Sequence, residues 1–508
     1  MTRSPLTQLA PELVRVFQDV GFTADGIAAY LGPDVHAALY RREPAVVRRA
    51  TADGSRFAGL IRAFILRDPL PATAFADLVG ASLAASLIDA RLADVDPHGT
   101  VRVILDVQPH TIVGINRWVF SDGDASFTGI VPGPDHVVGV GGASLSLLQA
   151  TPATLTGSVL DLGTGSGVQA LGQIGYAEAI TATDIHPRAL DLAEATFAAA
   201  GASDIELLEG PWFEPVAGRR FDRIVANPPF VVGLPNVGHV YRDSGLNLDS
   251  ASELVVSQAA EYLAEGGTAH LLAAWVHTPE STWEERVASW IPDVGVSAWF
   301  LQRDVADPAL HVGTWLRDET VDPLSPEGEA RTNAWLDHFE SHNVTGIGFG
   351  FVALRNIGDA PSEVVAESMT QAFSDPLGPE VEEYFLRAQW LRNRGVEDIM
   401  SARFFARPGL VKESISRADT EAEVGFVEAA LRLTRTDGPR WSHDVDKHVA
   451  ALVAGLHPQG LSLGETIGLY AMAQGYEEEE LMQLALPAFV DLIRRGMIVP
   501  VDLAGDEE

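Results

Sequence analysis

A tetrapeptide whose residue types could do chemistry, Asn227-Pro228-Pro229-Phe230, follows the apolar run 224–226, which predicts a buried strand. Proline cannot donate to a sheet ladder and fixes its own backbone angle, so the strand must end at the tetrapeptide. The side-chain oxygen of Asn227 and the backbone carbonyl of Pro228 are acceptors, and the two prolines hold that carbonyl in place. These acceptors can bind the N–H groups of a planar amine or carboxamide, and the ring of Phe230 can stack on it.

A second candidate site is the glycine turn "DLGTGSG", which spans Asp161 to Gly167 and follows a predicted strand. Its alternating glycines let the backbone turn sharply and approach a ligand closely. The nucleotide fingerprint G-x-G-x-x-G fails, because residue 168 is valine. Asp161 would repel a pyrophosphate but suits a cationic group. Asp184 ends the second predicted strand, where an acid can accept the hydroxyls of a ribose.

Strands and helices alternate from residue 157 to about residue 355. The strands are predicted in "SVLDLGTG", "AITATDI", "DIELLEG", "FDRIVANPPF", "TAHLLAAWV", "VSAWFLQRDV" and "GIGFGFVALRN". Strands that alternate with helices of roughly 10 to 15 residues predict an α/β fold with a doubly wound, mostly parallel sheet, here with seven strands. The last two strands lack a simple crossover, so one of them can run antiparallel.

The chain of 508 residues is too long for one ordinary core. We expect four regions: a helical, winged-helix-like domain at 1–100, a β-rich connector at 101–156, the α/β core at 157–357 and a helical, winged-helix-like domain at 358–508. In both terminal domains, we expect the helices to be followed by a β-ribbon. A domain of this kind serves either nucleic-acid docking or protein packing and dimerisation. The acidic run Glu477–Glu480 favours the second role at the C-terminus.

The composition limits the partners. The formal net charge of −35 opposes binding to a bare phosphate backbone. The one basic cluster, "RREPAVVRRA" at 41–50, is either a solvated helix face or a local contact surface. Cysteine is absent, which excludes disulfides and Cys-ligated zinc, and we predict no metal site. No apolar run reaches membrane-spanning length and no signal sequence is evident, so we expect a cytoplasmic protein with no membrane partner.

The glycine turn, the second-strand acid and the tetrapeptide, in this order, resemble class I S-adenosylmethionine-dependent methyltransferases. "LDLGTGSGVQAL" is similar to the first motif of the small-domain methyltransferases, which include ribosomal RNA guanine-N2 enzymes and release-factor glutamine enzymes. The resemblance implies a Rossmann-like fold and S-adenosyl-L-methionine as cofactor. The cofactor-binding residues that it implies are Asp161, Gly163, Thr164, Gly165, Asp184, Ile185, Ser144, Trp212 and Asn227.

Two segments bear on how the cofactor would be bound, one before the first motif and one after the third predicted strand. "VGVGGASLSL", which contains Ser144, is either the segment that closes over the carboxylate end of the cofactor or a glycine-rich linker. Pro211 stands where the family often has an acid that binds the adenine amino group, although Glu209 is near. Trp212 or Phe213 could instead flank the adenine ring, or belong to the core.

The resemblance also implies the chemistry: Asn227, Pro228 and Phe230 as catalytic residues, and Pro229, Phe230, Tyr241 and Arg242 as substrate-binding residues. We expect N-methylation of an exocyclic amine, with a nucleobase in RNA or a ribonucleoprotein as the first hypothesis. The alternatives are a protein glutamine and a winged-helix regulator whose core only binds cofactor. The segment 241–250 either resembles the part that follows the motif in glutamine methyltransferases or is a plain loop. An intact tetrapeptide argues against a regulator. An RNA substrate would need a locally basic groove, for which the candidates are Arg117, Arg223, Arg242 and Arg303.

Overall fold

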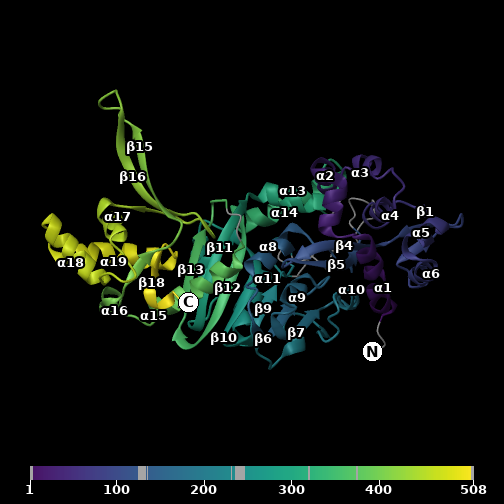
Figure 1. Cartoon of the computed structure of the whole chain (residues 1–508), viewed down its shortest axis with the longest axis horizontal. Coiled ribbons are helices and arrows are strands. Elements are labelled where there is room, and N and C mark those ends of the chain that lie inside the picture. Colours follow the sequence, from purple (N-terminus) through teal and green to yellow (C-terminus); the bar gives the residue numbers. More distant parts are fainter. Residues whose placement is uncertain are drawn as a thin grey trace. The chain divides into compact units, whose positions relative to one another are not determined.

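The computed structural model describes residues 4–123, 133, 135–229, 231–234, 246–318, 321–372 and 376–504 (Figure 1). The chain forms two compact units. The first contains residues 1–148 and 153–368, and the second contains residues 149–152 and 369–508. All of the predicted functional residues belong to the first unit.

The N-terminal part of the first unit packs helices against two small antiparallel sheets. Its helices are α1 (Pro5–Val20), α2 (Ala24–Tyr40), α3 (Pro44–Ala50), α4 (Arg56–Leu60), the π-helix η1 (Ile61–Ile65), α5 (Ala72–Val79) and α6 (Ala81–Asp89). Its strands are β1 (Leu70–Pro71), β2 (Ala93–Val95) and β3 (Thr100–Val103), in the order β1-β3-β2, and the hairpin β4 (Leu105–Ile112) with β5 (Ile115–Asp122).

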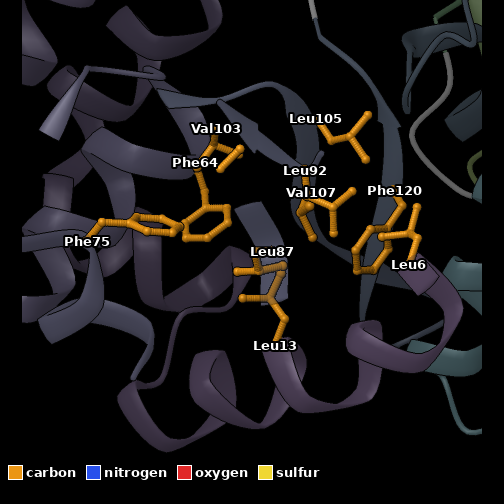
Figure 2. Close-up of a pocket in the computed structure, with 11 residues that line it drawn as sticks. Leu6, Leu13, Phe64, Phe75, Leu87, Leu92, Val103, Leu105, Val107 and Phe120 are labelled. Carbon is orange, nitrogen blue, oxygen red and sulfur yellow. The ribbon is translucent and has the colours of Figure 1, made fainter. Parts of the chain in front are cut away.

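Helix α1 shows how the sequence builds this core. Five of its residues that recur at helical spacing form a buried apolar stripe: Leu6, Ala10, Leu13, Val14 and Phe17. Figure 2 shows Leu6 and Leu13 facing side chains from η1, α5, α6 and the strands β3 to β5. The cavity between them is apolar and holds only about 10 Å³. A void of this size is a small packing defect of a core and has no room for a substrate.

The N-terminal helices pack directly on the α/β core. The hydroxyl of Thr7 on α1 donates to Glu194 on α10 (Pro187–Ala199) at 3.1 Å. The two helices share one hydrophobic cluster, which includes Leu192 and Ala195 of α10. In the described residues no single helix is long and apolar enough to cross a membrane, and one bent pair, α5 with α6, passes that test only by length and composition.

The centre of the first unit is one eight-stranded sheet with the order β13-β11-β12-β10-β9-β6-β7-β8. Its strands are β6 (Thr156–Leu162), β7 (Ala177–Asp184), β8 (Glu206–Glu209), β9 (Phe221–Ala226), β10 (Leu263–His277), β11 (Val294–Ala306), β12 (Gly346–Pro361) and β13 (Glu363–Ser368). Strands β6 to β10 pair in parallel, and β12 runs antiparallel to β10 and β11. The predicted Rossmann-like fold is confirmed, including its antiparallel strand. β13 is an eighth strand that the sequence did not predict.

Helices cover both faces of this sheet (Figure 1). They are α8 (Gly142–Ala150), α9 (Val168–Gln173), α10, α11 (Ser250–Ala259) with the 3-10 turn η3 (Ala260–Tyr262), α12 (Trp283–Ala288), α13 (Pro308–Asp318) and α14 (Pro326–Ser341), with the short turn η2 (Glu214–Val216) after β8. Alternate residues of β10 face opposite clusters. Ala273 and Trp275 pack with α11 and α12, whereas Ala274 and Val276 pack with α13 and α14.

The second unit contains both helices and strands. Its helices are α15 (Gly378–Arg392), α16 (Val396–Ser401), α17 (Lys447–Ala454), α18 (Leu463–Gln474), α19 (Glu478–Arg494) and the turn η4 (Val501–Leu503). Its strands are β14 (Phe404–Ala406), β15 (Leu410–Ala418), β16 (Phe426–Arg435), β17 (Ser442–Val445) and β18 (Ile498–Pro500). Helices α17 to α19 and β18 follow the sequence prediction for the C-terminus. The winged-helix character of either end stays a prediction.

The hairpin β15–β16 is a difference from the sequence prediction, which placed only helices and a terminal ribbon in this region. Figure 1 shows it as a long two-stranded arm. Most side chains of β15 are exposed on both faces, so the arm lacks the alternating apolar pattern by which a half-buried strand is recognised. Near the base of the arm, the guanidinium of Arg435 is buried and donates to the buried carboxylate of Glu380 at 2.7 Å.

Candidate functional site

The carboxyl ends of the parallel strands meet at one edge of the sheet. Leu162 of β6 is opposite Ala226 of β9, and Asp184 of β7 is opposite Glu209 of β8. The glycine turn, Asp184 and Asn227 therefore leave the sheet at the same edge, where open α/β sheets bind ligands.

The glycine turn has the conformation that the sequence predicted. Gly163, Gly165 and Gly167 have φ values of 70°, 54° and 86°, which side chains with a Cβ rarely adopt. A Cβ on Gly163 or Gly165 would meet no heavy atom within 4 Å, so space is open over the turn. On Gly167 a Cβ would lie 2.7 Å from the ring of Phe197. The first two glycines thus leave room for a ligand, and the third lets α10 pack closely.

Asp161 is fully buried and only half satisfied. Its Oδ2 accepts the hydroxyl of Thr164 at 2.7 Å and the amide of Ala170 at 2.9 Å. Its Oδ1 has no hydrogen-bond partner in the described part of the chain. Burial raises the pKa of this carboxyl to about 6, against the lowering effect of the two donors. A buried carboxylate oxygen without a donor suits a cationic N–H group of a ligand.

Asp184 connects the end of β7 to the glycine turn. Its Oδ2 accepts the amide of Gly165 and its Oδ1 accepts the amide of His186, both at 2.9 Å. Burial raises its pKa, and these amides act in the opposite direction. Each carboxylate oxygen has a second lone pair, so the group can still accept ligand hydroxyls. The neighbouring side chain of Ile185 is half exposed, an apolar surface beside this acid.

Two aromatic residues that follow β8, Trp212 and Phe213, are the candidates for contact with the adenine ring, and they differ in burial. Phe213 is buried and stacks on Tyr262 with ring centroids 4.5 Å apart, so it belongs to the core. Trp212 is half-buried and has a φ of 47°, an uncommon conformation for a bulky residue. Of the two, only Trp212 keeps an accessible surface near this edge, and its contact with a cofactor stays a prediction.

Asn227 lies next to Ser144, which comes from a distant part of the sequence. The Asn227 amide Nδ2 donates to the Ser144 hydroxyl at 3.4 Å. Helix α8, which carries Ser144, is held against α9 because Gln169 donates to the Ser144 carbonyl at 3.0 Å. The structure thus brings Ser144, the turn and the tetrapeptide together. The predicted residues Phe230, Tyr241 and Arg242 lie outside the described residues.

A cavity of about 320 Å³ opens beside the helix that carries Ser144. Its lining comes from α8 and from strands β10, β11 and β12: Gly142, Ala143, Ser146, Leu272, Ala273, Arg303, Asp304, Phe349, Gly350 and Phe351. Arg303 stands at a β-bulge, because the register of β11 against β12 shifts between Gln302 and Asp304. A bulge re-aims a side chain. The Arg303 guanidinium donates to the Ser146 hydroxyl at 3.0 Å and lies 3.3 Å from the Asp304 carboxylate.

The predicted basic groove is wrong for one of its arginines, Arg223, whereas the place of Arg117 in it stays a prediction. Arg223 is buried, and its guanidinium donates to Gln173 at 2.8 Å and to the Thr154 carbonyl at 3.2 Å. Arg117 donates to the Ala200 carbonyl at 3.2 Å, at the C-terminal end of α10. Both side chains are used for internal hydrogen bonds.

Sequence reasoning missed the aromatic wall of the cavity, Phe349 and Phe351. The signal in the sequence is weak: "GIGFGF" alternates glycine with larger apolar residues, which is equally typical of any strand that is packed closely.

Comparison with known proteins finds matches to family models in three parts of the chain. Residues 139–285 match the family described as methyltransferase small domain. Residues 19–104 and 382–500 match two domains of unknown function, DUF7059 and DUF7782.

Curated relatives match about a quarter of the chain, 26% in each of two cases. A release factor glutamine methyltransferase of Xylella fastidiosa is 35% identical over 138 residues, 26% of this chain and 48% of the relative. A ribosomal RNA small subunit methyltransferase C of Serratia proteamaculans is 32% identical over 134 residues, 26% of this chain and 35% of the relative. The chain thus spans about half the length, or less, of these relatives. A T. thermophilus 16S rRNA methyltransferase, solved with AdoMet and guanosine, is 18% identical with a TM-score of 0.28, and the match covers 47% of this chain and 65% of that one.

The sheet order and the residues at its edge define a Rossmann-like domain of the class I methyltransferase type. Within it, residues 139–285 are the part that matches the methyltransferase small domain family.

The buried carboxyl of Asp161 predicts how stability depends on pH. Its pKa in the folded protein, about 6, lies above the ordinary value of 3.8, so ionisation disfavours the fold. Wild-type protein should lose roughly 2 to 3 kcal/mol of unfolding free energy as the pH rises through this window, relative to Asp161→Asn. Urea unfolding of both proteins at pH 4 and pH 8 measures the difference.

Glu206→Gln is the control with the opposite sign, because the hydrogen bond from Arg219 lowers the pKa of Glu206. If the unfolding free energies of wild type and Asp161→Asn change equally between pH 4 and pH 8, ionisation of the Asp161 carboxyl does not destabilise the fold.

Proposed function

We propose that this chain is an S-adenosylmethionine-dependent methyltransferase that acts on a planar amine or carboxamide nitrogen. The observation that carries the proposal is the convergence of three groups at one sheet edge: the unpartnered Oδ1 of Asp161, the carboxylate of Asp184 and the amide of Asn227. The two carboxylates suit the cofactor and the Asn227 amide suits the substrate. A methyl transfer requires the cofactor and the planar nitrogen group to be held close together.

The residues present fit the cofactor. Asp161 Oδ1 would accept the ammonium of its methionine part, and the open space over Gly163 and Gly165 would admit that part close to the backbone. Asp184 would accept the ribose hydroxyls, and Ile185 and Trp212 offer apolar surface for the adenine. When bound, S-adenosylmethionine would supply a methyl group on a sulfonium, whose sulfur would leave as a neutral thioether. The methylated nitrogen would release one N–H proton to solvent after the transfer, so the transfer does not require a metal or a general base.

Asn227 is oriented to receive the substrate amine. Its Nδ2 donates to Ser144, which leaves the side-chain Oδ1 as an acceptor for one N–H. The carbonyl of Pro228 would accept the other. Two acceptors at fixed positions orient the nitrogen and raise its electron density without any reorganisation.

The substrate that the geometry supports best is a carboxamide in a protein, such as a glutamine side chain. Among the described residues that line the cavity beside α8, the one arginine is Arg303, and it is paired with Asp304. Arg117 and Arg223 are used internally, and the chain carries a net charge of −35. RNA binding depends on cations that displace counterions.

A nucleobase in a ribonucleoprotein is the second candidate. It is favoured by the phenylalanine at the fourth position of the tetrapeptide and by the similarity to ribosomal RNA small subunit methyltransferase C. A cytoplasmic location stays a prediction for either substrate.

The reaction is tested by transfer of a tritiated methyl group from labelled S-adenosylmethionine. A lysate incubated with the purified chain is separated into protein, RNA and DNA, with a lysate that lacks the added chain as the control. We expect label in protein, on glutamine after hydrolysis and mass analysis. Label in RNA alone would replace the first candidate with the second, and no added label in any fraction would contradict the proposed activity.

Asp184→Ala should weaken cofactor binding by roughly 1 to 3 kcal/mol, because charge-assisted hydrogen bonds to the ribose are lost. Calorimetry with S-adenosylhomocysteine measures this affinity. Glu206→Ala, on the adjacent strand β8 and paired with Arg219, should leave it unchanged. Equal affinity of wild type and Asp184→Ala would remove Asp184 from the site.

A further inference from the structure

His311 on α13 is a buried group that the mechanism above does not use. It is 2% exposed, and its Nε2 lies 2.8 Å from the carbonyl oxygen of Val232. Val232 follows Asn227 by a few residues and is itself fully buried. A side chain from the insertion between β11 and β12 thus contacts the backbone directly downstream of the tetrapeptide.

The partners of this ring fix its tautomer. The indole Nε1 of Trp315 donates to His311 Nδ1 at 3.2 Å. An indole nitrogen can only donate and a backbone carbonyl can only accept, so the proton of the neutral ring must be on Nε2. Burial lowers the pKa of His311 to about 4. At neutral pH the ring is therefore uncharged and donates one directed hydrogen bond to Val232.

The same segment is confined on its other sides. A Cβ on Gly233 would lie 2.5 Å from the ring of Trp335, so this backbone passes directly against α14. Gly233 also forms a β-bridge with Leu248. Upstream, the segment leaves β9 through two prolines, which allow few backbone conformations. His311 supplies the polar contact that ties the downstream end to α13.

His311 also contacts the wall of the cavity. Its ring stacks on Phe349 with centroids 5.7 Å apart and 27° between the planes. Phe349 lines the cavity beside α8. One side chain thus contacts both the segment after the substrate-binding motif and a wall of the space beside that motif.

We propose that His311 is a positioning residue, whose Nε2–H holds the backbone after Asn227-Pro228-Pro229 in the geometry that presents the amide acceptors to the substrate. His311 touches neither substrate nor cofactor. This inference rests on the proposed function for its consequence in catalysis, but the anchoring itself is independent of it.

The anchoring is tested on the full-length chain by hydrogen–deuterium exchange. His311→Leu keeps apolar volume but leaves the Val232 carbonyl without its donor. His311→Gln can restore a donor at a similar reach. The control is His270→Leu, which removes another buried histidine, on strand β10 of the sheet, that is bonded to Thr268.

We expect His311→Leu to accelerate exchange of the amides of residues 231–234 about tenfold, the scale of one lost hydrogen bond, and His311→Gln to recover most of the protection. In wild type, nitrogen NMR should show His311 protonated on Nε2 and not on Nδ1. Unchanged exchange in folded His311→Leu, or equal acceleration in His270→Leu, would overturn the anchoring role.

The catalytic consequence is measured separately. His311→Leu should lower kcat at least tenfold with cofactor affinity kept within a few-fold, and His311→Gln should recover most of this loss. If exchange accelerates but kcat holds, the anchor is real and the positioning claim is wrong. If no methyl transfer is found for any variant, the proposed function fails while the exchange result stands.

Discussion

The candidate site depends on one constraint: neighbouring parallel strands of a sheet end at the same edge. Strand pairing places Leu162 opposite Ala226 and Asp184 opposite Glu209, so three separate sequence motifs leave the sheet together. Strands β6 and β9 are mostly buried. The residues that follow them are polar, or are glycines with positive φ values and prolines, whose φ is fixed. The stability of the sheet therefore holds in place a set of groups that are individually unfavourable, of which the half-satisfied carboxylate of Asp161 is the clearest.

Two additions to the sheet complete the site. Helix α8 precedes β6 in the chain and places Ser144 against Asn227, while Ser146 receives a hydrogen bond from Arg303. Helices α13 and α14 are inserted between β11 and β12 and cover the segment that follows the tetrapeptide. The tetrapeptide thus follows a rigid strand, and the segment 231–234 after it is packed against helices, which is how a short loop can present hydrogen-bond acceptors with little reorganisation.

Sequence patterns predicted the sheet, its antiparallel strand and the three edge motifs, because hydrophobic periodicity, glycine conformation and proline are local signals. These patterns failed where the environment of a residue depends on partners that are distant in the sequence. The buried Arg223 was predicted in a groove, since its partners Thr154 and Gln173 are distant in sequence. The bulge at Arg303 depends on the register against β12, and the role of His311 depends on Val232, 79 residues away. The arm β15–β16 lacked a recognisable pattern because its side chains face solvent.

The central claim is that the Asn227 side chain contacts the substrate nitrogen and not the sulfonium of the cofactor. The most direct test is Asn227→Ala, with melting temperature, cofactor affinity and turnover measured on one preparation. The account predicts cofactor affinity within a few-fold of wild type and turnover reduced on the order of 10²-fold or more. If Asn227 only caps a turn, the variant would lose about 1 kcal/mol of stability and keep its turnover per folded molecule. A stable and fully active Asn227→Ala would contradict the mechanism.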